Sequence, residues 1–313
     1  PDKTILYLAY LNYTLAPDAA DVDFPGNVEV QLCGMPGLAL YKEPKVWAEY
    51  QGNIDRWREL SGRKVQTWEY SCWPADRTSA YYQYPHTLQE YYRHNRDKIV
   101  GSFINGTTRT DESVRHHITL YAWLRIMWNP DVDVDAILDE YARRMYGSAG
   151  DEIREILQLA CDRWQNVDWG SEGRAVLPDD VYEKSFTPEV VDRMRKLLAS
   201  AQEKTAADKL LSKRMAFFAQ PFDAFFTEAK MVHSGEGARP LIAGKVDEKP
   251  VVDGKLDEAW WDTLPVSTFM KNAGTATQVE PRYATELRVG WTLDGLAFGF
   301  TLEEPNTDAL YTN

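Results

Sequence analysis

The chain has 313 residues, of which 44% are hydrophobic and 27% charged, a composition typical of globular domains and not of disordered chains. At roughly 100–200 residues per domain, this length predicts two or three domains. The formal net charge of -13 repels nucleic acids and anionic membranes, so we expect neither as a partner, whereas neutral sugars remain acceptable ligands. No apolar run reaches the ~18 residues that a membrane span needs, so we expect no membrane span.

The first hundred residues alternate short apolar runs with helical patterns, which predicts a parallel sheet with right-handed crossovers. The expected helices are Pro44–Leu60 and Leu88–Lys98. Four strands are too few to close an eight-stranded barrel, so an open doubly wound sheet is the alternative. No glycine-rich phosphate loop follows any strand, which weakens the nucleotide-binding version of that alternative. The expected strands are Ile5–Tyr10, Val28–Cys33, Val65–Cys72 and Ile99–Asn105.

The middle of the chain has a helical pattern. It runs from Glu112 to Trp169, and Gly147 is suited to end one helix within it. A polar loop then leads to Thr187-Pro188-Glu189, a good helix start with a hydroxyl N-cap and a proline at the first helical position. Two further helices are expected to reach about Val232.

The last part of the chain changes from helical to alternating periodicity. His233–Pro240 is polar and glycine-rich, as expected of a linker. Beyond it, Glu286–Trp291 and Leu296–Leu302 are predicted strands joined across Asp294-Gly295, a strong hairpin signal. Two or three strands cannot bury a sandwich core, so we expect the natural protein to continue.

The three cysteines are Cys33, Cys72 and Cys161. Three are too few for a disulfide scaffold, and none shows the C-x-x-C spacing of a zinc site. Cys33 and Cys72 follow adjacent predicted strands and could form a disulfide, although two buried thiols are the preferred interpretation. His116-His117 lacks partners at i,i+4, so we expect no metal ion and no cofactor.

A series of landmarks runs from Lys3 to Trp169. They are Tyr7-Leu8-Ala9-Tyr10, Asn27-Val28-Glu29-Val30-Gln31-Leu32-Cys33, Trp68-Glu69-Tyr70, Gly101-Ser102-Phe103, Leu120-Tyr121-Ala122-Trp123-Leu124, Trp128-Asn129-Pro130 and Tyr146-Gly147. In order and spacing they resemble the C-terminal part of the domain of unknown function numbered 4838. That family is similar to (β/α)8-barrel glycoside hydrolases, including α-glucuronidases, and the resemblance implies that the four strands are barrel strands five to eight. The family often has Trp-Asp-Tyr where this chain has Trp68-Glu69-Tyr70.

A second resemblance covers about Lys249 to Pro305. Val252-Asp253-Gly254-Lys255-Leu256-Asp257-Glu258-Ala259-Trp260 is similar to the opening of a family 9 carbohydrate-binding module, and two later stretches are similar to its early strands. We therefore predict an α/β plus β fold with four parts. They are the second half of a (β/α)8 TIM-like barrel (1–130), a helical segment (131–232), a linker (233–248) and the N-terminal part of a carbohydrate-binding β-sandwich (249–313).

Glycoside hydrolysis needs two carboxyl groups, which in a barrel lie at the C-terminal ends of strands. Glu69 is the best catalytic candidate, because it lies late in a strand between two aromatic residues that could raise its pKa. The alternative is a structural carboxylate. Glu29 lies early in its strand and is expected in an interior polar layer. The partner acid is expected outside this chain, since related barrels often carry one at strand four.

Aromatic and amide side chains lie at or just beyond the ends of three strands, and such groups suit a sugar subsite. For each, local packing or capping is the alternative. The chain has 11 Trp and 17 Tyr, which suits sugar stacking, although large cores also use aromatic residues. The candidate substrate-binding residues are Tyr10, Asn12, Trp68, Tyr70, Trp73 and Asn105.

In the second stretch, Trp260 and Trp261 are candidate sugar-stacking residues, although a core role is the preferred interpretation. Asp253, Asp257 and Glu258 could bind calcium, but turn and cap roles are preferred.

The leading hypothesis is an extracellular or periplasmic glycoside hydrolase-like protein that hydrolyses O-glycosidic bonds of a polysaccharide or oligosaccharide, with an appended sugar-binding module. The first alternative is a non-catalytic glycan-binding protein on a degenerate barrel. The second is an assembly protein whose helical segment, Thr187 to Val232, docks a partner; an exposed apolar stripe there would favour it.

Overall fold

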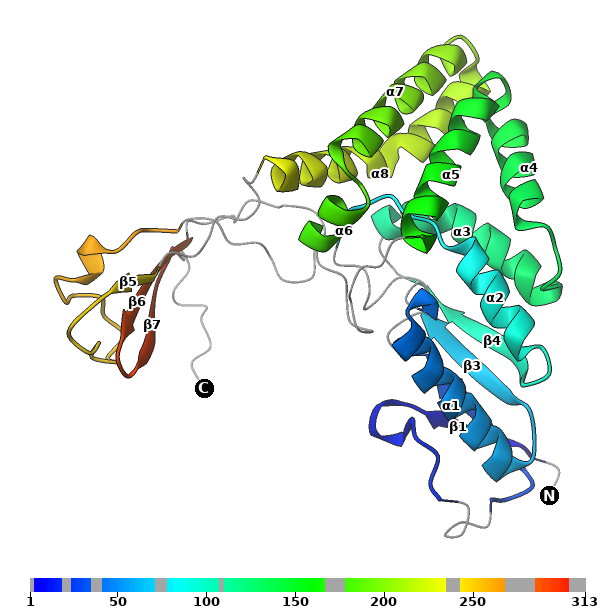
Figure 1. The fold of residues 1–313 in the computed structure, drawn as a ribbon, viewed down its shortest axis with the longest axis horizontal. Coiled ribbons are helices and arrows are strands. Elements are labelled where there is room, and N and C mark those ends of the chain that lie inside the picture. The colour runs from blue at the N-terminus through cyan, green and yellow to red at the C-terminus, as the bar shows by residue number, and fades with distance from the viewer. Residues whose placement is uncertain are drawn as a thin grey trace. The chain divides into compact units, whose positions relative to one another are not determined.

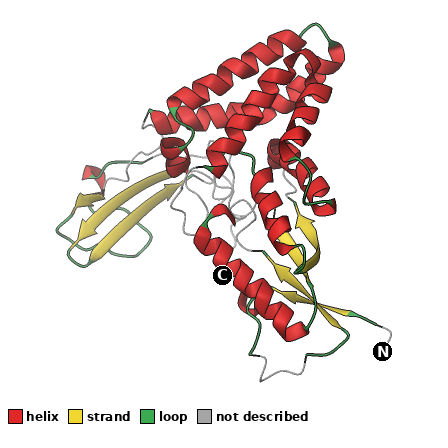
Figure 2. Ribbon diagram, turned by 45° about the vertical axis from the view of Figure 1, so that its right-hand side comes forward, coloured by secondary structure: helices red, strands yellow, loops and turns green. Residues whose placement is uncertain are grey.

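The computed structural model describes residues 3–18, 24–34, 41–70, 78–106, 110–166, 178–234, 243–267 and 285–303. The chain divides into two compact units, Pro1–Ser234 and Gly235–Asn313, each with its own hydrophobic core (Figure 1). The first unit combines strands and helices, and the second is built on a sheet (Figure 2). The predicted α/β plus β class is therefore confirmed at this level. Among the described residues, no helix is long and apolar enough to span a bilayer.

The first unit contains a four-stranded sheet, in which all neighbouring strands are parallel and follow one another in chain order. Its strands are β1 Ile5–Ala9, β2 Val28–Cys33, β3 Val65–Tyr70 and β4 Ile99–Asn105. The connecting helices are α1 Pro44–Ser61 and α2 Pro85–Asn95. α1 starts with a proline in its first turn and is capped by Gly62, whose φ of 64° favours glycine. The predicted strand–helix alternation is confirmed, and the described part of the third strand ends at Tyr70.

The two faces of this sheet differ, because side chains alternate along each strand. One face packs on α1 and α2: the ring of Tyr7 lies 5.5 Å from that of Trp57, and Leu32 and Val65 are fully buried. The opposite face carries Leu8 and Phe103, exposed at 40% and 48%. We call this second face the open face of the sheet.

The remaining helices of the first unit share one core with the sheet, which includes Ala9 and Ala229 at its two ends in the sequence. Most predicted helices are confirmed, and α4 ends at Gly147 with a φ of 53°. The polar loop expected before Thr187 is wrong in part, because α6 forms there and Tyr182 and Phe186 are buried. The helices are α3 Thr110–Trp128, α4 Val134–Tyr146, α5 Gly150–Gln165, α6 Pro178–Lys184, α7 Pro188–Thr205 and α8 Lys209–His233.

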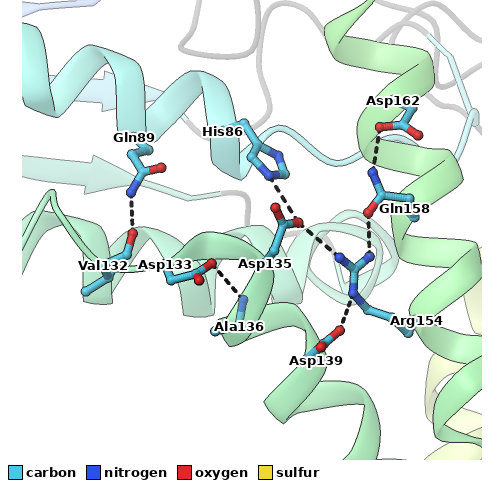
Figure 3. A network of polar contacts seen from close by, with 10 residues as sticks. All are labelled: His86, Gln89, Val132, Asp133, Asp135, Ala136, Asp139, Arg154, Gln158 and Asp162. Carbon is cyan, nitrogen blue, oxygen red and sulfur yellow. Dashed lines mark hydrogen bonds and ion pairs between the residues drawn. The ribbon is translucent and has the colours of Figure 1, made fainter.

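A network of polar contacts joins α2, α4 and α5 (Figure 3). The Arg154 guanidinium donates to Asp139 at 2.6 Å and to Asp135 at 3.0 Å, and His86 Nε2 lies 3.4 Å from Asp135. Gln158 Nε2 continues the network to Asp162 at 2.7 Å. These contacts stabilise the packing of the helices rather than form a site, since each charged group in the network has a partner.

The second unit has a three-stranded sheet. β5 Ala243–Lys245 pairs in parallel with β6 Thr285–Thr292, and β6 pairs in antiparallel with β7 Gly295–Leu302. The predicted hairpin is confirmed, with Leu293 and Asp294 between the paired residues. On one face the strands carry Gly299, where a Cβ would lie 2.8 Å from the Trp261 ring, so this tryptophan packs directly on the backbone.

Candidate functional site

A cluster of polar and aromatic side chains lies at the C-terminal ends of the strands, on the open face of the sheet. The register pairs Tyr70 with Asn105, and Tyr10 follows directly after the pair Ala9 and Leu32. Tyr10 and Asn105 both lie near enough to the Tyr70 hydroxyl to affect its pKa. These three residues, from three different strands, form the cluster that we call the rim.

Burial raises the pKa of Tyr70 far above its usual range, and the neighbouring Cys33 and Tyr10 raise it further. The Cys33 thiol is buried, and burial followed by the charge of Glu69 raises its pKa to about 11. Both groups are therefore neutral at physiological pH and available only for hydrogen bonding and packing. Cys33 and Cys161 are free thiols, whereas Cys72 lies outside the described residues.

The chain leaves β1 through a strained turn beside the rim. Leu11 has a φ of 48°, the one positive φ at a non-glycine residue in the described part of the chain. It begins the short 3-10 helix Leu11–Tyr13, which leaves Asn12 and Tyr13 exposed. Such strain persists only where the surroundings enforce it and is concentrated at functional sites.

The remaining predicted substrate residues occupy different positions. Trp68 lies on the open face below Tyr70, half-buried, with its ring 4.4 Å from that of Phe103. Trp73 lies outside the described residues. The structure thus brings Tyr10, Tyr70 and Asn105 together, with Asn12 and Trp68 next to them.

Glu69 does not join the rim, because it alternates with Trp68 and Tyr70 and points to the helix-covered face. Its side chain is completely buried. One carboxylate oxygen accepts hydrogen bonds from Tyr91 at 2.7 Å and Tyr50 at 3.2 Å, and the other accepts one from Tyr41 at 3.4 Å. We call Glu69 and these three tyrosines the carboxyl cage.

The cage is buried and aromatic. The rings of Tyr41 and Tyr50 stack at 4.8 Å, and that of Tyr91 lies 5.3 Å from Tyr41. Burial raises the pKa of Glu69 to about 7, opposed by the hydroxyls of Tyr91, Thr67, Tyr50 and Tyr41. This value agrees with the expectation that the surroundings of Glu69 raise its pKa. The cause is burial among tyrosines on the helix-covered face, and not the neighbouring Trp68 and Tyr70.

The sequence alone did not single out Tyr41, Tyr50 or Tyr91 for this role. Tyr50 and Tyr91 occupy inward positions of α1 and α2, where an aromatic ring predicts core packing and nothing more. No local signal connects them with a carboxyl group 19 or 22 residues away.

The other acid of the sheet is Glu29, which lies on the open face and accepts a hydrogen bond from Gln66 at 2.9 Å. It lies at the second position of β2, far from the C-terminal end, and its place in an interior polar layer stays a prediction. The described groups that act on Tyr70 are the side chains of Cys33, Tyr10 and Asn105. The described part of the rim is thus made of hydroxyl, amide and ring groups around a buried Tyr70, and such groups recognise neutral hydroxylated ligands.

In the second unit, Trp261 is 3% exposed and belongs to the core, whereas Trp260 is half-buried, with its ring 4.1 Å from that of Trp261. Burial leaves Trp261 no free face for a sugar and favours its core role. Glu258 accepts hydrogen bonds from the Trp261 indole at 2.8 Å and from the Val251 amide at 2.6 Å.

Two acidic residues of this opening, Asp253 and Glu258, have structural partners. Asp253 accepts from the Lys255 amide at 3.0 Å, as in an Asx turn, beside Gly254 with a φ of 83°. No group of three potential metal ligands occurs among the described residues. Asp253 and Glu258 thus have the turn and cap roles that the sequence favoured.

Taken by class, the first unit is an α/β domain with a polar, aromatic rim at the C-terminal ends of its parallel strands. Residues 1–158 match the family described as Domain of unknown function (DUF4838), and the chain belongs to that family. No match was found among curated proteins or among solved structures.

Proposed function

We propose that the protein binds a polysaccharide or oligosaccharide at the rim, as part of a glycoside hydrolase-like protein outside the cytoplasm. The observation that carries the proposal is the convergence of Tyr10, Tyr70 and Asn105 from three parallel strands. In sheets of this kind, ligands bind beyond the carboxyl ends of the strands. Phenol and amide groups suit sugar hydroxyls, and the ring of Tyr13, exposed in the short helix that follows Tyr10, suits stacking.

The proposed architecture around this site is a (β/α)8 barrel, of which β1 to β4 are consecutive strands. Two observations support it. The strands follow chain order without the reversal that a doubly wound sheet requires. The open face carries Leu6, Leu8 and Phe103 at 40% exposure or more, although parallel sheets are normally covered on both faces.

Hydrolysis by Glu69 is the second candidate function. Its pKa of about 7 is that of a general acid near neutral pH. Against it stands the orientation of the side chain, which faces three tyrosines and not the rim. Reaction at a sugar also needs a second carboxyl within roughly 5–10 Å. Glycan binding without hydrolysis by Glu69 is therefore the better-supported function.

Affinity electrophoresis of the full chain in gels with soluble β-glucan, xylan or mannan tests binding. We expect retardation by at least one polymer. Tyr10→Ala and Asn105→Ala should abolish it, since each removes a rim group. Trp128→Ala, which removes a tryptophan that is 92% exposed on α3, should leave it unchanged. If both rim variants are still retarded, the polymer binds at another site and the proposed rim site is wrong.

Release of reducing ends from a retarding polymer tests the second candidate. We expect Glu69→Gln to retain whatever turnover the chain shows. Abolished turnover with unchanged polymer retardation would instead identify Glu69 as the reacting acid.

The second unit is proposed to be the beginning of a sugar-binding β-sandwich. Phe298 and Phe300 are each 53% exposed on one face of β7, as expected where a second sheet would pack. An appended module of this kind would raise the effective concentration of the first unit at a polymer surface.

The assembly hypothesis receives less support. In the described part of 187–232, the exposed large apolar side chains are Leu210 and Phe217, which make no long stripe.

A further inference from the structure

The carboxyl cage also connects the chain on either side of the rim. The Gly34 amide donates to the Trp68 carbonyl at 2.7 Å, so the end of β2 is held against β3. A Cβ at Gly34 would overlap a Glu69 carboxylate oxygen and the Tyr41 hydroxyl. The backbone therefore passes directly over the carboxyl group, with Cys33 and Tyr70 as the next residues on the open face.

Three phenols from different places in the chain meet at the carboxyl. Tyr41 precedes α1, Tyr50 lies on α1 and Tyr91 on α2. In addition, the Tyr50 hydroxyl lies 3.4 Å from the Leu32 carbonyl, at the end of β2. One carboxyl group thus fixes the ends of two strands and two helices relative to one another.

We infer that Glu69 is a positioning residue for the rim, and that losing its proton loosens the cage and weakens sugar binding. This inference rests on the proposed function. Among the described residues, no basic side chain pairs with the Glu69 carboxylate. A buried carboxylate of this kind is relieved by admitting water, and water can enter the cage only if the surrounding phenols and the Gly34 backbone move apart. Because Glu69 lies between Trp68 and Tyr70, that movement displaces the rim.

The other groups facing the carboxyl do not titrate near neutral pH. Burial raises the pKa of Tyr41, Tyr50 and Tyr91 well above 10, and that of Tyr92 likewise. The pKa of Cys33, beyond the end of β2, is about 11. The His94 imidazole contacts the ring of Trp47, which in turn contacts Tyr91.

The test measures the dissociation constant of the full chain for the retarding polymer between about pH 5.5 and about pH 8.5, which brackets the pKa of Glu69. For the wild type we expect affinity to fall at least about fivefold as pH rises, the lower end of ordinary coupling between sites. Glu69→Gln should keep the affinity of the low-pH form throughout. Glu29→Gln, the same change on the neighbouring strand and opposite face, should retain the wild-type profile.

Tyr91→Phe, which removes one donor and keeps the ring, should shift the midpoint of the profile upward, because that hydroxyl lowers the pKa of Glu69. If Glu69→Gln shows the wild-type pH profile, or if wild-type affinity is flat, the inference is overturned while sugar binding stands. If no polymer is retarded at any pH, the proposed function itself fails.

Discussion

Two carboxyl groups that the sequence placed in functional motifs have opposite surroundings. Glu69 is completely buried and is bonded by phenols. Glu258 lies at the surface of the second unit, bonded by a backbone amide and an indole. Burial raises the pKa of Glu69 to about 7, whereas the hydrogen bond from the Val251 amide lowers that of Glu258.

The difference teaches that the number of hydrogen bonds does not decide the charge of a carboxyl group. Glu69 has three phenol donors and Glu258 has two N–H donors, yet only Glu69 favours its neutral form. Exposure to water decides the charge, because burying a carboxylate costs more free energy than hydrogen bonds from neutral donors restore. Glu69 therefore fits a buried structural role, and Glu258 fits a cap.

The largest effect is expected from Trp261→Ala. This residue is the indole donor to Glu258 and is 3% exposed in a small core, so its loss should destabilise the second unit by about 3–5 kcal/mol. Hydrogen exchange of β6 and β7 would report unfolding of this unit. Protected strands in the variant would contradict the core role. Trp128→Ala, at a 92% exposed position, is the control and should change little.

The second effect concerns the pH dependence of the first unit. The folded chain keeps the Glu69 proton up to a pKa of about 7, whereas the unfolded chain releases it near 4.5. Stability should therefore decline as pH rises through this window, by about 3 kcal/mol in total. Urea unfolding at a series of pH values measures it. Glu69→Gln should remove this decline, and an equally steep decline in the variant would assign it to other groups.

The third effect comes from Gly34→Ala, which places a methyl group on the carboxyl cage. Gly34 is not among the glycines with positive φ, so its backbone conformation does not by itself strain an alanine. The collision of the new methyl group with the cage should lower the free energy of unfolding by about 1–3 kcal/mol. Gly52→Ala in α1 meets no atom within 4 Å and should be neutral or stabilising. Thermal unfolding compares the two variants, and an equal response would show that the cage has room.

The smallest effect is expected from Glu258→Gln. Because the folded pKa of Glu258 is lowered, its contribution exists above the unfolded value of about 4.5 and is lost as pH falls. The variant should thus be less stable than the wild type at neutral pH and equal to it in acid. A difference that persists in acid would mean that shape, and not charge, makes the cap effective.

Much of the fold could be predicted locally. Apolar and β-branched runs located β2 and β4 at their observed bounds, and Gly147 marked the end of α4. α6 was missed, since a helix of seven residues between polar segments has too few turns to show a period.

The orientation of Glu69 was beyond local inference. The side chains of Val65–Tyr70 alternate between the two faces of the sheet, and each of the two resulting sets contains large or apolar members. The pattern therefore does not tell which set meets the helices. The choice depends on three hydroxyls supplied by distant residues, Tyr41, Tyr50 and Tyr91. They satisfy a carboxyl group that would otherwise be too costly to bury.

The sequence by itself determined the four strands of the first sheet, the β6–β7 hairpin, most of the helices and the residues at the strand ends, because hydrophobic period and turn chemistry act over a few positions. It missed β5, which lies in the stretch expected to be a linker. Only the tertiary structure decided which of those residues share a face: Tyr10, Tyr70 and Asn105 at the rim, and Glu69 behind it. The physical reason is that the burial of a polar group depends on partners brought together by folding, and these lie far apart along the chain.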